Sequence, residues 1–256
     1  MMTLDRALEL TQDLSGLAFS SFLFVHLASP IGAAIVGRGG SSESVASSIQ
    51  LAGRVVYRDG RLREALLVWI PLGTHLVVGL VRRVTRLNRQ RRIRAQLELR
   101  AQLAEGLPPP GRRARAIPKQ SNFQWLKSYL PTTAHAIAGY IAIPLLLDHI
   151  LSHRLNASPS LRSFQFVGFN LQQSPLIASI KYAALLSTSL YHSLVGLDQV
   201  FSRLAPSNLS KRKSISESQS SLYVCLGWVG IVGTVGLGIR KLAREPIPLW
   251  MARRYQ

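Results

Sequence analysis

The chain has 256 residues, of which 47% are hydrophobic, and it carries a formal net charge of +19. In a soluble protein such a charge would favour nucleic-acid binding. The basic residues here lie in the connections between long apolar blocks, so we expect no nucleic-acid partner. The single cysteine, Cys225, lies inside an apolar block, which excludes a disulfide framework and a cysteine metal site.

Five apolar segments each approach the ~20 residues that a membrane-spanning helix needs. They cover roughly residues 14–36, 64–81, 132–152, 174–197 and 221–239. The second is the shortest and contains Pro71. The pattern predicts an all-α integral membrane protein with five transmembrane helices, forming a single membrane domain over residues 1–256.

The distribution of basic residues predicts the orientation in the membrane. The N-terminus, residues 82–131 and residues 198–220 together hold 18 Lys and Arg, against 12 on the other side. By the positive-inside rule, the N-terminus and residues 82–131 are expected in the cytosol. The pattern of residues 86–105 predicts a basic amphipathic helix within this loop, which ends at Gly106. It would either lie on an anionic membrane surface or be solvated.

A repeated spacing of glycine and histidine links the first four apolar segments. Gly16 precedes His26 by ten residues, and Gly139 precedes His149 by ten. In the second and fourth segments the histidine comes first: His75 precedes Gly79 by four residues, and His192 precedes Gly196 by four. The spacing predicts that helices 1–4 form a duplicated helical hairpin.

In a parallel duplication, His26 would face His149 and His75 would face His192. Facing imidazoles on two bundle helices are a way of holding a b-type haem, so these four histidines are candidate iron ligands for up to two haems. Four glycines at the spacings above would clear space for the flat macrocycle: Gly16, Gly79, Gly139 and Gly196. The alternative is ordinary hydrogen bonding and close packing between membrane helices.

Four further polar residues belong to the third and fourth segments. His135 also stands four residues before a glycine, Gly139, and His153 lies one turn beyond His149 near the membrane interface. We expect Asp148 and Lys181 at the same end of their helices. There they would either pair with each other or meet a haem propionate.

The stretches THLVVGLVRR and YHSLVGLDQV resemble the haem-ligating helix of the cytochrome b subunits of succinate dehydrogenase, and HAIAG at 135–139 is similar to the first-helix signature of that subunit. Five helices with four histidines also resemble the dihaem membrane anchors of fumarate reductase. This chain has Leu197 and Asp198 where the Arg-His pair of that helix begins. The resemblance implies a dihaem b-type cytochrome that exchanges electrons with quinone.

A resemblance over more of the chain is to the fungal mitochondrial adaptor family with the MCP transmembrane domain. It is carried by SGLAFSSFLFVHL, HAIAGYIAIPLLLDHILSHR and YHSLVGL. It implies a non-enzymatic protein of the mitochondrial outer membrane that contacts membrane lipids and acts in lipid homeostasis at contact sites. It also implies recruitment of a lipid-transfer bridge protein through a Pro-x-Pro segment, for which the candidates are residues 108–110 and the pair Pro246 and Pro248. We take the adaptor as the expected function and the cytochrome as its alternative.

Overall fold

The computed structural model of the chain describes residues 3–36, 41–58, 60–104, 130–155, 164–204, 217–247 and 253. Within these ranges every regular element is helical and no strand occurs, which confirms the predicted all-α class. Four helices in the described part are long and apolar enough to cross a membrane: Leu4–Ile35, Arg61–Arg100, Ala134–Leu155 and Leu222–Leu242. The chain therefore has the helices of a multi-pass membrane protein.

Contacts between Cα atoms divide the chain into two compact units. The smaller unit contains residues 1–14 and 73–132, and the larger contains residues 15–72 and 133–256. Helices α1 (Leu4–Ile35) and α4 (Ile70–Ala104) each contribute to both units. The single membrane domain over residues 1–256 stays a prediction.

The smaller unit joins the start of α1 to the middle of α4. Arg82 donates hydrogen bonds to Gln12 Oε1 at 2.6 Å and to Glu9 Oε1 at 3.2 Å. Arg89 lies 3.8 Å from Asp5. Because residue numbers fall along α1 as they rise along α4, the two segments are antiparallel.

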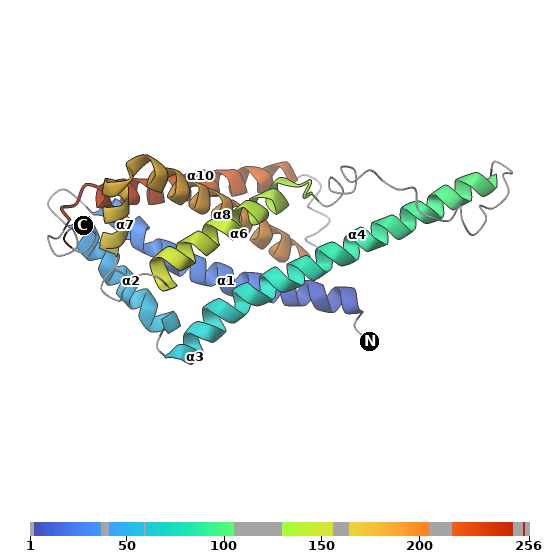
Figure 1. Cartoon of the computed structure of the whole chain (residues 1–256), viewed down its shortest axis with the longest axis horizontal. Helices are drawn as coiled ribbons and strands as arrows, with labels where there is room; N and C mark the ends of the chain where they lie inside the picture. The colour runs from blue at the N-terminus through green and yellow to red at the C-terminus, as the bar shows by residue number, and fades with distance from the viewer. Residues whose placement is uncertain are drawn as a thin grey trace. The chain divides into compact units, whose positions relative to one another are not determined.

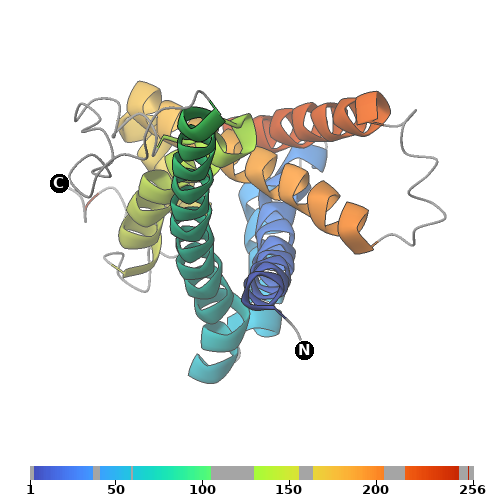
Figure 2. The same cartoon turned by 90° about the vertical axis from the view of Figure 1, so that its right-hand side faces the viewer.

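In the larger unit α8 (Pro175–Leu204) packs against both α6 (Ala134–Ile150) and α10 (Glu217–Leu242). Figure 1 and Figure 2 show α8 beside both neighbours. Leu27 of α1, Leu190 of α8 and Val235 of α10 form the centre of the largest apolar cluster. Thr133 caps α6 by accepting a hydrogen bond from the backbone N–H of Ala136.

Two short helices, α2 (Ser42–Arg58) and α7 (Phe164–Gln173), lie at the end of the larger unit where α10 finishes. Gln172 donates to the carbonyls of Ala243 and Glu245, and Glu245 accepts from the backbone N–H of Ser42. Lys241 donates to the carbonyls of Ala34 and Val36 at the end of α1. These contacts satisfy backbone groups that the helix ends leave free.

Two of the predicted helix boundaries differ from the structure. The first helix begins at Leu4 instead of near 14, because the polar residues before 14 pair with arginines of α4. The basic segment 86–105 is helical but is no separate helix: it continues from the apolar part of α4 without a break and ends at Ala104. Pro71 is accommodated at the start of α4, after a π-helical turn, η1 (Ala65–Trp69).

The fourth predicted span, 174–197, is the helix α8, but it is not among the four helices apolar enough to cross a membrane by composition. Its polar side chains have partners on other elements. Lys181 bonds to Asp148 of α6, the hydroxyl of Tyr182 contacts Asn170 of α7, and His192 contacts the carbonyl of His135. A helix surrounded by such partners does not need an apolar surface all round.

Candidate functional site

A cavity of about 260 Å³ lies inside the larger unit. All the major helices of that unit contribute to its wall, together with the π-helical turn η2 (Leu151–Leu155) that follows α6. Apolar side chains form most of the wall, and they include Phe19, Leu146 and Leu190. Most of the polar residues in the wall come from α2 and η2, and they are joined by His26 of α1, Glu64 at the end of α3 (Arg61–Glu64), His149 of α6 and Tyr182 of α8, so the cavity has a defined polar side.

Three imidazoles lie in a row along this polar side. The ring centroids of His26, on α1, and His149, on α6, are 6.1 Å apart with the rings at 75°. The centroids of His149 and His153 are 4.5 Å apart. Phe22 lies one turn before His26 and stacks on it with centroids 5.7 Å apart. The approach of His26 to His149 is the arrangement that the Gly-His repeat predicts.

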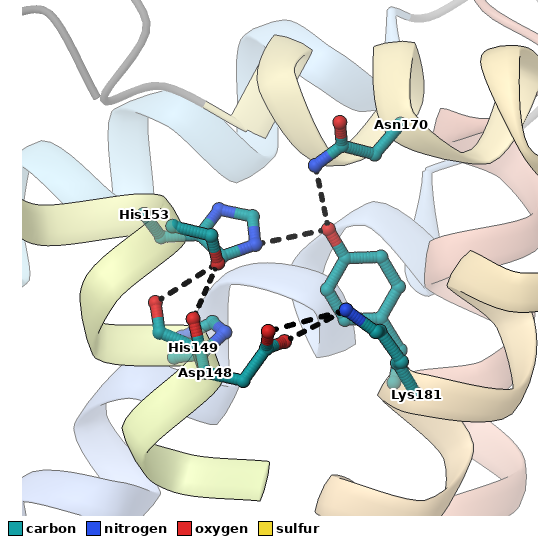
Figure 3. A network of polar contacts seen from close by, with 7 residues as sticks. Asp148, His149, His153, Asn170 and Lys181 are labelled. Carbon is teal, nitrogen blue, oxygen red and sulfur yellow. Dashed lines mark hydrogen bonds and ion pairs between the residues drawn. The ribbon is translucent and has the colours of Figure 1, made fainter. Parts of the chain in front are cut away.

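A short hydrogen-bonded chain fixes the third histidine. Asn170 Nδ2 donates to the hydroxyl of Tyr182 at 3.3 Å, and that hydroxyl lies 3.0 Å from Nε2 of His153. Since an amide nitrogen only donates, the Tyr182 oxygen accepts this bond and its own proton is available for His153. Figure 3 shows this chain, with Asn170 on α7 reaching across to the residues of η2 and α8.

His149 differs from its neighbour in its hydrogen bonding. Its Nδ1 atom is buried and has no hydrogen-bond partner. Buried polar atoms are almost always paired in native proteins, so this unpaired ring nitrogen, on a residue that lines the cavity, is an exception that a bound group would account for.

Two ion pairs lie near the row of histidines. Glu64, just before η1, forms a two-point pair with Arg154 of η2, with N–O distances of 2.9 and 2.8 Å, and it also accepts from Trp69 Nε1 at 3.3 Å. Lys181 and Asp148 are 3.1 Å apart, and both side chains are about half exposed. Their pairing with each other is one of the two arrangements expected from the sequence (Figure 3).

A second histidine pair lies at the start of α6 and in the second half of α8. The rings of His135 and His192 are parallel within 6°, with centroids 4.2 Å apart. Nδ1 of His192 lies 3.0 Å from the carbonyl oxygen of His135, so it donates to that carbonyl. Each ring also packs beside the glycine of the opposite helix, His192 against Gly139 and His135 against Gly196.

The predicted site residues are thus distributed as follows. His26 and His149 share the cavity, whereas His192 contacts His135. His75 belongs to the smaller unit, where its Nδ1 contacts the carbonyl of Gln12 at 3.3 Å and the neighbouring Gly79 lies against the Gln12 side chain. His75 and His192 belong to different units, so their pairing stays a prediction. Gly139 and Gly196 leave space for imidazole rings, at the positions where the sequence predicts space for a macrocycle. Gly16 lies on α1, ten residues before His26.

Sequence reasoning missed the contribution of α2 and α7 to the site. Residues 42–58 lie between the first two predicted spans and carry no predicted site residue, yet α2 supplies Gln50, Arg54 and Tyr57 to the cavity wall. The available signal was the apolar spacing of Val45, Ile49 and Gly53, which places one face of a helix against α1. The Tyr182–His153 contact had no local signal because its members lie 29 residues apart.

No group of three or more His, Cys, Asp or Glu side chains in the described part of the chain is placed to hold a metal ion. A haem iron needs only one or two protein ligands and therefore no such group. Comparison with protein families, with curated proteins and with solved structures finds no match to this chain. The candidate Pro-x-Pro residues 108–110 and Pro248 lie outside the described residues.

Proposed function

We propose that the chain is a multi-pass membrane protein that binds one b-type haem in its central cavity, with His26 and His149 as the iron ligands. The observation that carries the proposal is the pair of imidazoles on α1 and α6 in the cavity wall, whose centroids are 6.1 Å apart. An iron ion that accepts one ring nitrogen from each side at about 2 Å places the two centroids about 6 Å apart.

The residues present fit such a group in three respects. Both donors are imidazoles on facing helices, the usual way to build a cofactor site in a helical bundle. The buried Nδ1 of His149 has no hydrogen-bond partner, and the rest of the wall is mainly apolar. The cavity, at about 260 Å³, is slightly smaller than the ~300–1,000 Å³ of most small-molecule sites, so side chains in its wall must move to admit a macrocycle.

Bound haem would supply one-electron chemistry in this apolar site. The protein's own residues would position the ligands. The hydrogen-bonded chain from Asn170 through Tyr182 holds His153 beside His149, and Phe22 packs on His26. Arg54 lines the cavity and would be a cationic partner for a propionate, whereas Lys181 pairs with Asp148 and neither belongs to the cavity wall.

The test is the absorbance spectrum of the purified full-length protein, produced with added haem precursor. A reduced-minus-oxidised difference spectrum with b-type Soret and α bands and one haem per chain is expected. His26→Ala and His149→Ala should each remove the bands, whereas Tyr182→Phe, which leaves both imidazoles in place, should retain them. A folded protein that stays free of haem after incubation with haem would overturn the proposal.

The same preparation tests the dihaem alternative. Two haems per chain, with half the absorbance lost in His75→Ala and His192→Ala, would support the pair of sites suggested by the repeat. Reduction of the bound haem by a quinol would then support electron exchange with quinone. A single haem whose absorbance is unchanged in both His75→Ala and His192→Ala would leave only the His26–His149 site.

The second candidate function is the adaptor of mitochondrial lipid homeostasis that the family resemblance implies. The observation that favours it is the length of α4, which continues to Ala104 well past its apolar part and carries exposed arginines. A helix of this kind offers a partner a surface outside the membrane. We further infer that α8 is a fifth transmembrane helix, enclosed by α6 and α10, and that helices α1, α4, α6 and α8 form the duplicated bundle.

A further inference from the structure

The start of α1 packs against one face of α4. His75, Gly79, Arg82 and Arg89 follow one another at intervals of four, three and seven residues, which places them on the same side of a helix. All four contact α1: His75 and Gly79 at Gln12, Arg82 at Gln12 and Glu9, and Arg89 at Asp5. The contacts on the α1 side are thus made by acidic and amide groups.

This face continues beyond the point where α1 begins. The same spacing, extended from Arg89, reaches Ile93, Leu97 and Arg100. Ile93 is 45% exposed and Leu97 is 57% exposed, and Arg100 is also exposed. The stretch from 90 to 100 contains four arginines and one glutamate. The uncovered part of the face is therefore an apolar stripe in a basic surrounding, about 15 Å long at 1.5 Å per residue.

The described contacts indicate which occupant this stripe fits. Where the face is covered, the covering segment is an antiparallel helix whose residues at positions 5, 9 and 12 form contacts with arginines of α4. The uncovered part repeats the same combination of arginines with small or apolar residues. A helix placed end to end with α1 would continue the existing interface with matching charge.

We propose that residues 90–100 of α4 dock an acidic amphipathic helix of a partner protein, antiparallel to α4 and in line with α1. A lipid surface is a poorer occupant. The segment continues the axis of an uninterrupted helix, whose apolar span ends just before Arg82 and Arg83. Leu97 lies 14 residues beyond Arg83, or about 21 Å along that axis. This exceeds the ~8–10 Å over which a charged membrane surface acts in physiological salt. The proposal does not depend on the cavity or on haem.

The experiment measures binding of a fluorescent peptide to the full chain in nanodiscs of zwitterionic lipid. The probe is a designed helix with glutamates at i, i+4 and i+7 and a leucine stripe, and its control is a scrambled peptide of the same composition. We expect the designed peptide to bind, and to weaken as salt rises. The scrambled peptide should bind at least tenfold more weakly.

The matched variants are Leu97→Glu and Leu99→Glu. Both leucines are exposed on α4, at 57% and 39%, but Leu99 lies two residues away and therefore off the face of Ile93 and Arg100. Leu97→Glu should weaken binding at least tenfold and Leu99→Glu less than twofold, with equal helix content by circular dichroism. Equal loss in both variants, or equal binding of the scrambled peptide, would overturn the proposal. Binding to vesicles containing phosphatidylserine that depends on Leu97, without peptide binding, would assign the face to the membrane instead.

Discussion

The imidazole of His192 occupies the space beside Gly139: an ideal Cβ atom on that glycine would lie 2.7 Å from Cε1 of His192. The relationship is reciprocal, because His135 approaches Gly196 on the opposite helix, although at a normal contact distance of 3.5 Å. Two His-x-x-x-Gly segments in antiparallel helices thus place each ring on the other helix's glycine. The pair fixes the register of α6 against α8.

We expect Gly139→Ala to destabilise the protein by about 1–3 kcal/mol, the usual cost of overpacking a close contact. The ring of His192 cannot move aside freely, because it stacks on His135 and bonds to that residue's carbonyl. Gly196→Ala should cost clearly less, since its Cβ would meet only a normal contact. Thermal unfolding in detergent, followed by tryptophan fluorescence, measures both. Equal unfolding temperatures for the two variants would contradict this account of the register.

Gly238 makes the closest approach of α10 to α1. A Cβ atom there would overlap the backbone carbonyl of Pro30, and a backbone atom cannot rotate away as a side chain can. Gly238→Ala should therefore disturb the packing of α10 more than any substitution at an open glycine of the same helix. Gly233→Ala is the matched control, because nothing lies within 4 Å of its Cβ position. The expected result is aggregation or a lower unfolding temperature for Gly238→Ala alone.

The sequence predicts much of the helix content because long apolar runs and their breaks are local features. It also predicts the approach of His26 to His149, since a fixed spacing repeated in two segments carries information about depth in a bundle. It does not predict that His192 packs with His135. Both His135 and His75 have a glycine four residues later, and only the antiparallel register of α6 and α8 selects the partner.

The missed elements share a physical cause. The helix α2 has a polar surface overall and a narrow apolar face, so composition alone suggests a loop; its role in the cavity wall depends on Ile49 reaching Gly32 of α1. For a similar reason the sequence predicts a start of the first helix that is too late. Asp5 and Glu9 look like residues before a helix until Arg89 and Arg82 are brought opposite them.

The ion pair between Glu64 and Arg154 should contribute to stability. The side chain of Glu64 is only 15% exposed and that of Arg154 31%, and removing one partner leaves the other partly buried without a counter-charge. We expect Glu64→Gln and Arg154→Gln each to cost about 1–3 kcal/mol, and the double substitution to cost less than their sum. Urea or thermal unfolding in detergent measures the free energy of unfolding of each variant, and the four values form a double-mutant cycle. Additive costs would show that the pair itself contributes nothing.

Lys181 and Asp148 provide the comparison for that cycle. Their side chains are 53% and 50% exposed, and exposed pairs contribute only about 0–1 kcal/mol because solvent screens them. Lys181→Gln should therefore leave the unfolding temperature nearly unchanged.

The final prediction concerns how α8 and α4 are placed with respect to the membrane. In a variant with Cys225→Ser, a single cysteine is introduced at Ala95, at Gln173 or at Leu204, all of which are exposed. The first lies on the basic part of α4, and the other two flank α8 at its start and its end. A maleimide that cannot cross membranes is added to intact mitochondria, and labelling is compared before and after the outer membrane is opened.

If α8 crosses the membrane as a fifth span, Gln173→Cys and Leu204→Cys must lie on opposite sides. The excess of basic residues further predicts that Ala95→Cys and Leu204→Cys lie in the cytosol, since both belong to the side with 18 Lys and Arg. These two should react in intact mitochondria, and Gln173→Cys only after the outer membrane is opened. Labelling of Gln173 and Leu204 from the same side would reduce the number of spans to the four that composition supports. Protection of Ala95 in intact mitochondria would instead reverse the orientation or remove the protein from the outer membrane. That result would also place the arginine-rich face of α4 out of reach of any cytosolic partner.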